Sequence, residues 1–247
     1  MQSLLPPPAQ PATVRDPDPP VAPRPRAPGR GLGLLRRVLQ DRERLLAEVV
    51  DGAPLPLGKV AVAGLALTAL AGVGLGAAAG PLQALSAAVK APLVTLGAIA
   101  VCFPAFFIFG LLQGSRLQLE QSLRLFAVGV GLRGAILAGL APLLFFFSSV
   151  GSPYGFLLLM GLLVFGAADY GMLRTVVRGV ELLRERHEDT FSRRFVLGWT
   201  ALYLAVAVQL TWTLRPFIRH PDEAFTFIGG RGNMFTYFLE HVGKLLG

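Results

Sequence analysis

Two residues of opposite charge interrupt apolar stretches of this chain, and they are the strongest candidates for a functional site. Arg133 stands within GVGLRGAILAGL, and Asp169 stands within LLVFGAADYG. A charge in the middle of a lipid bilayer costs at least about 3 kcal/mol on insertion scales. A guanidinium opposite a carboxylate lowers that cost through a bidentate, charge-assisted pair. We therefore take Arg133 and Asp169 as a candidate buried ion pair.

The positions of these two residues predict that they meet. Arg133 precedes Phe147 by 14 residues, and Asp169 follows Tyr154 by 15 residues. Two antiparallel helices joined by the short connection between them would hold both side chains at a similar depth. One interpretation is a structural pair that sets the register of the helices. The alternative is a polar element of a path for ions, protons or a substrate.

A second candidate polar cluster lies at the end of the last apolar stretch. It consists of Gln209, Thr211, Thr213 and Arg215, with Trp212 among them. Hydroxyls in a membrane helix bond to their own backbone or to a neighbouring helix, and Trp and Arg suit the membrane interface. Helix packing is the favoured interpretation of this cluster, and ligand binding is the alternative.

Small residues recur at intervals of four in two apolar stretches. Such stripes let helix backbones approach closely. They could join helices within one chain or two copies of the chain in a homo-oligomer, and packing within the chain is favoured. The candidate helix-packing residues are Gly72, Gly76 and Gly80 in one stretch and Gly131, Ala135 and Gly139 in the other.

Residues suited to catalysis or metal binding form no recognisable motif. His187, His220 and His241 are scattered, and Cys102 is the only cysteine, so the sequence offers no set of metal ligands. The glycine-rich stretch at 228–233 follows no predicted strand and lacks the Lys-Ser/Thr pair of a phosphate loop. We expect a protein that is not an enzyme and needs no cofactor.

The composition places these residues in a lipid bilayer. Of the 247 residues, 53% are hydrophobic and only 15% are charged, unlike a soluble domain. A hydrocarbon core about 30 Å thick needs about 20 apolar residues per helix. We predict an all-α fold, a polytopic transmembrane helical bundle of about five spans, with four spans and a re-entrant segment as the alternative. The predicted spans are Gly58 to Ala79, Pro92 to Leu112, Leu123 to Phe147, Tyr154 to Val177 and Phe195 to Phe217.

Four regions follow from this division. Residues 1–31 hold ten of the nineteen prolines and are expected to be a disordered Pro/Arg-rich tail. Residues 32–57 contain an amphipathic helix from Leu34 to Val50 and a linker; the helix would lie in the membrane interface or pack on another chain. Residues 58–217 form the transmembrane bundle. Residues 218–247 form a tail with an interfacial helix from Met234 to Leu246.

The distribution of arginines predicts the orientation of the chain. The net charge is +8, and basic residues gather before the first span and around the second and fourth connections. By the positive-inside rule the N-terminus is cytoplasmic and the C-terminus external. The abundance of Ala, Gly, Leu and Arg is typical of a GC-rich bacterial genome, so we expect the bacterial inner membrane. No module for binding nucleic acid is recognisable.

Two resemblances accompany this layout. Five spans behind a cytoplasmic tail resemble the Yip1-like group of membrane proteins, over Lys59 to Phe217 and in topology only; the Asp-Leu-Tyr-Gly-Pro type motif of the eukaryotic members is absent. The string Trp212 to Phe217, followed by Arg231-Gly-Asn233, looks like a bacterial group of polytopic proteins without an established activity.

The sequence favours a non-enzymatic membrane anchor or scaffold subunit. Such a protein sits in the lipid bilayer and binds a protein partner in a membrane complex through its tail or its amphipathic helices. The alternative is a small oligomeric channel or transporter subunit in which Arg133 and Asp169 lie in a polar path. A membrane enzyme is the third hypothesis, since no nucleophile and base can be assembled from the sequence.

Overall fold

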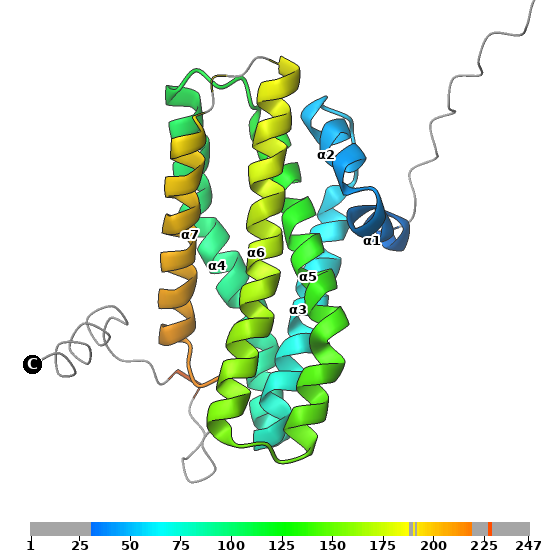
Figure 1. Ribbon diagram of the computed structural model, residues 1–247, viewed down its shortest axis with the longest axis vertical. Helices are drawn as coiled ribbons and strands as arrows, with labels where there is room; N and C mark the ends of the chain where they lie inside the picture. Colours follow the sequence, from blue (N-terminus) through cyan, green and yellow to red (C-terminus); the bar gives the residue numbers. More distant parts are fainter. Residues whose placement is uncertain (1–30, 188–189, 191, 219–226, 229–247) are drawn as a thin grey trace, which may run out of the picture.

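Helices make up all the regular secondary structure in the described part of the computed structural model, which covers residues 31–187, 190, 192–218 and 227–228. Figure 1 shows their arrangement. The predicted tail before residue 31 and the predicted helix from Met234 to Leu246 lie outside the described residues. The elements are α1 (Gly31–Gln40), α2 (Arg42–Val50), α3 (Leu57–Gly76), the short 3-10 helix η1 (Ala77–Ala79), α4 (Pro81–Leu112), α5 (Leu119–Ser149), α6 (Tyr154–His187) and α7 (Arg193–Thr213).

Five of these helical segments are long and apolar enough to cross a membrane: α3 with η1, α4, α5, α6 and α7. The predicted all-α bundle with five spans is therefore confirmed. Large apolar side chains lie exposed on the outside of the bundle, among them Val62, Val101 and Leu162, each at least 60% exposed. Lipid is the solvent that makes such a surface favourable.

The second span begins eleven residues earlier than predicted. The sequence placed its start at Pro92, whereas α4 starts at Pro81, directly after a turn in which Gly80 has φ +98°. Pro92 and Pro104 both lie inside the helix. Lys90, assigned from the sequence to the preceding connection, is instead a fully buried residue of α4. Polar residues on one side of this helix lower the mean hydropathy of its first turns, so a prediction from hydropathy places its start too late.

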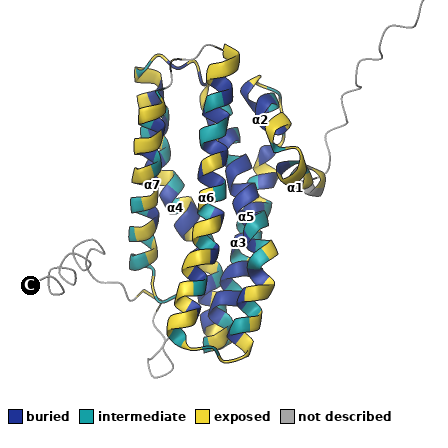
Figure 2. Cartoon of the chain, in the orientation of Figure 1, coloured by how far each residue is buried: buried dark blue, intermediate teal, exposed yellow. Residues whose placement is uncertain are grey.

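The helix backbones are neighbours in the order α6, α5, α3, α4, α7. Aromatic side chains then link α7 back to α5, because the Trp199 ring lies 5.4 Å from that of Phe126. Buried residues prevail on α3 and α5, whereas α7 shows mostly exposed and intermediate residues (Figure 2). The centre of the bundle is therefore the contact between α3 and α5.

That contact is made by backbone on backbone. A Cβ atom added to Gly134 would lie 2.5 Å from the Cα of Gly64, and one added to Gly64 would lie 2.8 Å from the carbonyl carbon of Val130. Real Cβ atoms do not approach other carbons so closely. Only glycine at these two positions allows the observed separation of the helices.

The predicted amphipathic helix from Leu34 to Val50 is two helices. The chain leaves the helical conformation at Asp41, which has φ −124° and ψ 37°. Asp is a poor residue for a helix interior, and the bend lets both halves turn their apolar side chains to the same surface. Val38 of α1 and Leu45, Leu46 and Val49 of α2 are buried in the main apolar core. This apolar face thus packs against the chain's own bundle rather than on another chain, and the predicted position in the membrane interface stays a prediction.

Candidate functional site

Arg133 is enclosed at the junction of α3, α5 and α6. Its side chain is 2% exposed. The Nε atom donates a hydrogen bond to Oδ1 of Asp169 on α6 at 2.6 Å, and Nη1 donates to Oγ1 of Thr68 on α3 at 3.2 Å. One side chain therefore ties three helices together through two of its nitrogens.

Helix geometry explains why Arg133 and Asp169 meet. Arg133 lies 16 residues before the end of α5 at Ser149, and Asp169 lies 15 residues after the start of α6 at Tyr154. At 1.5 Å per residue these positions are about 24 and 22 Å from the connected ends. The structure thus brings together the two residues that the sequence analysis paired.

The geometry of the pair differs from the bidentate arrangement expected. A single nitrogen of Arg133 bonds to a single oxygen of Asp169, and Oδ2 of Asp169 has no hydrogen bond within the described part of the chain. The Asp169 side chain is 19% exposed. The guanidinium carbon also lies 5.6 Å from the centre of the Phe165 ring, a cation–π distance. The cation is therefore held on several sides, while the carboxylate keeps one oxygen available.

Thr68, like Phe165, belongs to this site without having been predicted from the sequence. Its hydroxyl donates to the Gly64 carbonyl at 2.9 Å, so the same oxygen can accept the bond from Arg133. Gly64 is the residue whose backbone Gly134 touches. The spacing of Gly64, Thr68, Gly72 and Gly76 at intervals of four was the available signal, because it places the hydroxyl on the face that meets other helices.

The hydroxyls of the candidate polar cluster of the last span bond within their own helix. The Thr211 hydroxyl donates to the Ala207 carbonyl and that of Thr213 to the Gln209 carbonyl, each within α7. The Arg215 guanidinium lies 3.7 Å from the Trp212 ring centre. These contacts are local to the end of the helix, as the packing interpretation expects.

The candidate stripes of small residues are only partly helix contacts. Gly72 and Gly76 face the α4 backbone at Ala87 and Gln83, and Gly131 faces Val60 of α3. Gly80 instead forms the turn before α4, and a Cβ on Gly139 would meet nothing within 4 Å. Ala135 is half-buried. The contacts observed are within one chain.

A second buried cation lies on α4. Lys90 of α4 is 0% exposed, and its ammonium donates to the Pro216 carbonyl at 3.0 Å. Gln83, on the same helix, donates to the Pro216 and Phe217 carbonyls at 2.8 and 3.0 Å. These contacts hold the segment after α7 against α4.

Charged residues fix α2 to the end of α6. Arg178 pairs with Glu43 at 3.1 Å, and Arg186 pairs with Asp51 at 2.6 Å. Arg178 and Arg186 are eight residues apart, as are Glu43 and Asp51, the residue that follows α2, so α2 runs parallel to this part of α6. We call α1, α2 and this end of α6 the collar.

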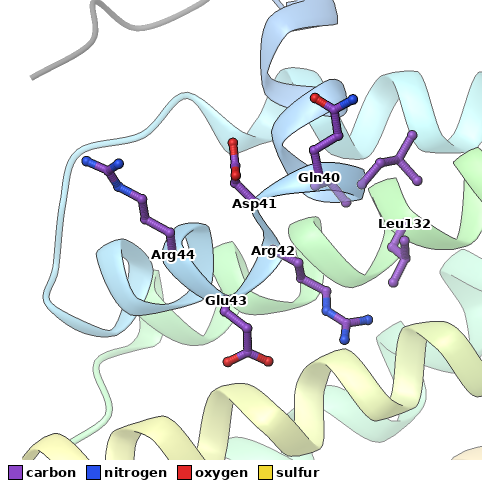
Figure 3. Close-up of a pocket in the computed structure, with 8 residues that line it drawn as sticks. Gln40, Asp41, Arg42, Glu43, Arg44 and Leu132 are labelled. Carbon is purple, nitrogen blue, oxygen red and sulfur yellow. The ribbon is translucent and has the colours of Figure 1, made fainter.

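The bend between α1 and α2 borders a surface hollow of about 510 Å³. Figure 3 shows Arg42 and Glu43 directed toward α6, with Leu132 of α5 forming another side. Arg42 makes no ion pair or hydrogen bond within the described part of the chain, and Leu39 at the rim is 56% exposed. The hollow therefore offers both an uncommitted cation and apolar surface.

Among the described residues no group of three or more His, Cys, Asp or Glu could hold a metal ion. No protein-family model, no curated protein and no solved structure matches the chain. The five-span layout behind the first resemblance is present in the structure, and no family assignment follows from it.

Proposed function

We propose that this polytopic membrane protein is a non-enzymatic anchor or scaffold subunit, and that the collar is where it binds another protein of a membrane complex. The observation that carries the proposal is the fixed position of α2. Two ion pairs in parallel register and a buried apolar face attach it to the bundle. A docking element held this way loses little freedom on binding.

The hollow beside the collar supplies the chemistry for such a contact. Arg42, which has no partner among the described residues, can pair with a carboxylate of the partner. Leu39 is an exposed apolar side chain at the rim and can enter a pocket on that partner. The partner's surface would then combine an acidic group with an apolar recess.

Site-specific photo-crosslinking in membranes of cells that naturally contain the protein tests this proposal. A photoreactive residue at Leu39 is expected to give a discrete crosslinked protein that copurifies in fixed ratio after gentle solubilisation. The matched control is Leu112, an apolar residue 75% exposed at the end of α4. Arg42→Glu should abolish the crosslink from Leu39. Crosslinks to lipid alone from both positions would contradict the scaffold.

A transport function is the second candidate, and one observation favours it. Asp169 keeps an oxygen without a hydrogen bond and is partly exposed in an otherwise apolar span, as in proton and ion paths of membrane proteins. Flux measured in liposomes with the purified chain tests it. Cation or proton flux that Asp169→Asn removes would support transport over the scaffold.

We further propose that the collar is cytoplasmic and that the membrane is a bacterial inner membrane. The basic residues near the collar support this orientation by the positive-inside rule. Cysteines introduced at Ser3 and Arg184 should react only with a reagent in the cytoplasm, and one at Ser149 only with a reagent outside. Labelling of Arg184 and Ser149 from the same side would contradict the orientation.

A further inference from the structure

Lys90 is a buried cation that lacks a carboxylate among the described residues. Its ammonium has one hydrogen bond, to the Pro216 carbonyl, and lies 5.9 and 4.8 Å from the ring centres of Phe217 and Phe227. A carbonyl and two aromatic faces attract the charge but do not neutralise it. An ammonium that is 0% exposed is stable as a cation only beside an anion.

Two further polar side chains lie on the same face of α4. Ser86 precedes Lys90 by four residues and Gln83 precedes it by seven, so the three form a row along the helix. Gln83 is 1% exposed and Ser86 is 3% exposed. Gln83 donates from its amide nitrogen to two carbonyls, whereas Oε1 of Gln83 and Oγ of Ser86 have no hydrogen-bond partner among the residues that the structure describes.

The unsatisfied hydroxyl of Ser86 is an exception among the Ser and Thr residues of the described helices. The other Ser and Thr side chains in the described helices donate to a backbone carbonyl, most of them four residues back in their own helix. Thr95, one helix turn beyond Lys90, does so at 3.2 Å to Ala91, and Ser148 instead bonds across to Gly74 at 2.8 Å. A buried hydroxyl without such a bond is costly unless something else satisfies it.

We propose that Gln83, Ser86 and Lys90 form a binding site for a phosphate-type oxyanion that also carries an O–H group. An anionic oxygen of the ligand accepts hydrogen bonds from the Lys90 ammonium and the Ser86 hydroxyl. The O–H group of the ligand donates to Oε1 of Gln83, an acceptor that has no donor among the described residues. Hydrogen phosphate and the phosphoglycerol headgroup of an anionic lipid both have this combination.

The surroundings favour the lipid headgroup as the source. Leu82, Leu85 and Val89 each immediately precede a residue of the polar row and are 57%, 63% and 45% exposed, so an acyl chain can lie beside the row. Lys90 lies nine residues from the start of α4, or about 14 Å along a helix of about 48 Å. A hydrocarbon core about 30 Å thick, centred on this helix, leaves about 9 Å at each end, so the Lys90 backbone lies about 5 Å inside the core, and its long side chain can reach back to the level of the headgroups.

The test measures which lipids the purified full-length chain retains. The protein is exchanged from detergent into mixtures of phosphatidylglycerol and phosphatidylcholine, and bound lipid is counted by native mass spectrometry. The wild type should retain phosphatidylglycerol preferentially. Lys90→Met, which keeps the length of the side chain but not its charge, should lower that retention about tenfold or more, as loss of a buried charge-assisted bond does.

Two further variants separate binding from folding. Ser86→Ala removes one oxygen and should lower retention severalfold while the melting temperature stays the same or rises. Lys59→Met, at an exposed lysine of α3, is the matched control and should retain lipid like the wild type. If Lys90→Met fails to fold, Ser86→Ala and Gln83→Met still decide the question.

Addition of inorganic phosphate distinguishes the two sources. Phosphate that raises the melting temperature of the lipid-free wild type, but not of Ser86→Ala, identifies free phosphate as the ligand. Retention of phosphatidylglycerol without a response to phosphate identifies the headgroup. The proposal is overturned if the wild type retains both lipids equally and does not respond to phosphate. It is also overturned if Lys90→Met and Ser86→Ala both bind lipid and phosphate like the wild type. None of these measurements depends on a protein partner, so the proposed scaffold function can be disproved independently of the anion site.

Discussion

The two sides of the bundle bury their contacts by different means. On the side of α3, α5 and α6, Gly64 and Gly134 bring two backbones together with no side chain between them. Where α4, α5 and α7 meet, rings fill the space: Phe106 of α4 lies 5.3 Å from Phe126 of α5 and 5.1 Å from Trp199 of α7, in edge-on contacts. Lipid tails are as apolar as either interface, so both depend on close fit rather than on exclusion of water.

The two buried cations differ in the same way. Arg133, on the glycine side, has a carboxylate, a hydroxyl and an aromatic ring around it. Lys90, on the aromatic side, has one carbonyl and two rings. The described residues of the first side therefore balance its buried charge, whereas those of the second side leave a buried charge without an opposite one. Mutations on the two sides should therefore change the stability of the bundle by different amounts and for different reasons.

The largest effect is expected from Asp169→Asn. Removing the carboxylate leaves Arg133 buried without an opposite charge, which should destabilise the bundle by roughly 3 kcal/mol or more. The double replacement Arg133→Leu with Asp169→Leu should recover much of that loss. Thermal unfolding in detergent measures both. Asp51→Asn, at an exposed pair with Arg186, is the control, and a single mutant at Asp169 as stable as the wild type would show that the pair contributes nothing.

Gly134→Ala tests the backbone contact itself. The added methyl overlaps the backbone of Gly64, so α3 and α5 must separate, at a cost of about 1 to 3 kcal/mol. Gly139→Ala, where nothing lies within 4 Å, should leave the free energy of unfolding unchanged or raise it slightly. Equal unfolding temperatures for the two variants would argue against the close approach.

Trp199→Phe tests the aromatic side with a smaller change. The variant keeps a ring but loses the hydrogen bond that Nε1 donates to the Cys102 carbonyl at 2.8 Å. The expected loss is about 1 kcal/mol, since hydrogen bonds in membrane bundles are individually weak. Chemical denaturation in mixed micelles can resolve it. A loss as large as that of Asp169→Asn would mean that the aromatic side is as dependent on polar bonds as the glycine side.

Glu43→Gln should have the smallest effect. The Glu43 and Arg178 side chains are 57% and 32% exposed, so solvent and salt screen their attraction, which is worth less than about 1 kcal/mol. Unfolding of the bundle should hardly change, while protease cleavage near Asp41 should become faster as α2 loosens. Unchanged cleavage would indicate that the apolar face alone fixes the collar.

The features that could be predicted from the sequence are those that depend on the length of apolar stretches and on the depth of a residue along its helix. Five apolar stretches define five helices, and counting from one short connection pairs Arg133 with Asp169, because helix rise is constant. Lys90 escaped prediction for a physical reason. The hydropathy of α4 falls over its first turns, where Gln83, Ser86 and Lys90 are buried against the segment after α7, and a contact between residues 126 positions apart leaves no local signal.

The helix-packing stripes show the same limit. Intervals of four correctly mark residues of one helix face, but they do not say whether that face meets a helix, a turn or lipid. Gly72 meets α4, Gly80 forms a turn and Gly139 faces open space. Gly64 and Gly134, which bring the α3 and α5 backbones into contact, were not singled out, because Thr68 interrupts the run of small residues between Gly64 and Gly72, and Gly134 lies one residue outside the other stripe. Likewise, the bend at Asp41 depends on the bundle surface that α1 and α2 cover.

The short connection between α5 and α6 has a consequence for how the protein enters the membrane. Only residues 150–153 separate the two helices, so Asp169 is synthesised soon after Arg133 and on the adjoining arm of the same hairpin. Arg133 therefore does not have to stay unpaired in lipid until a distant part of the chain is synthesised. Insertion of α5 and α6 as one hairpin carries a nearly neutral pair across the hydrocarbon, whereas α5 alone would carry an uncompensated charge. A ribosome stalled before Asp169 should accordingly leave α5 poorly inserted, and one stalled after α6 should leave both helices in place.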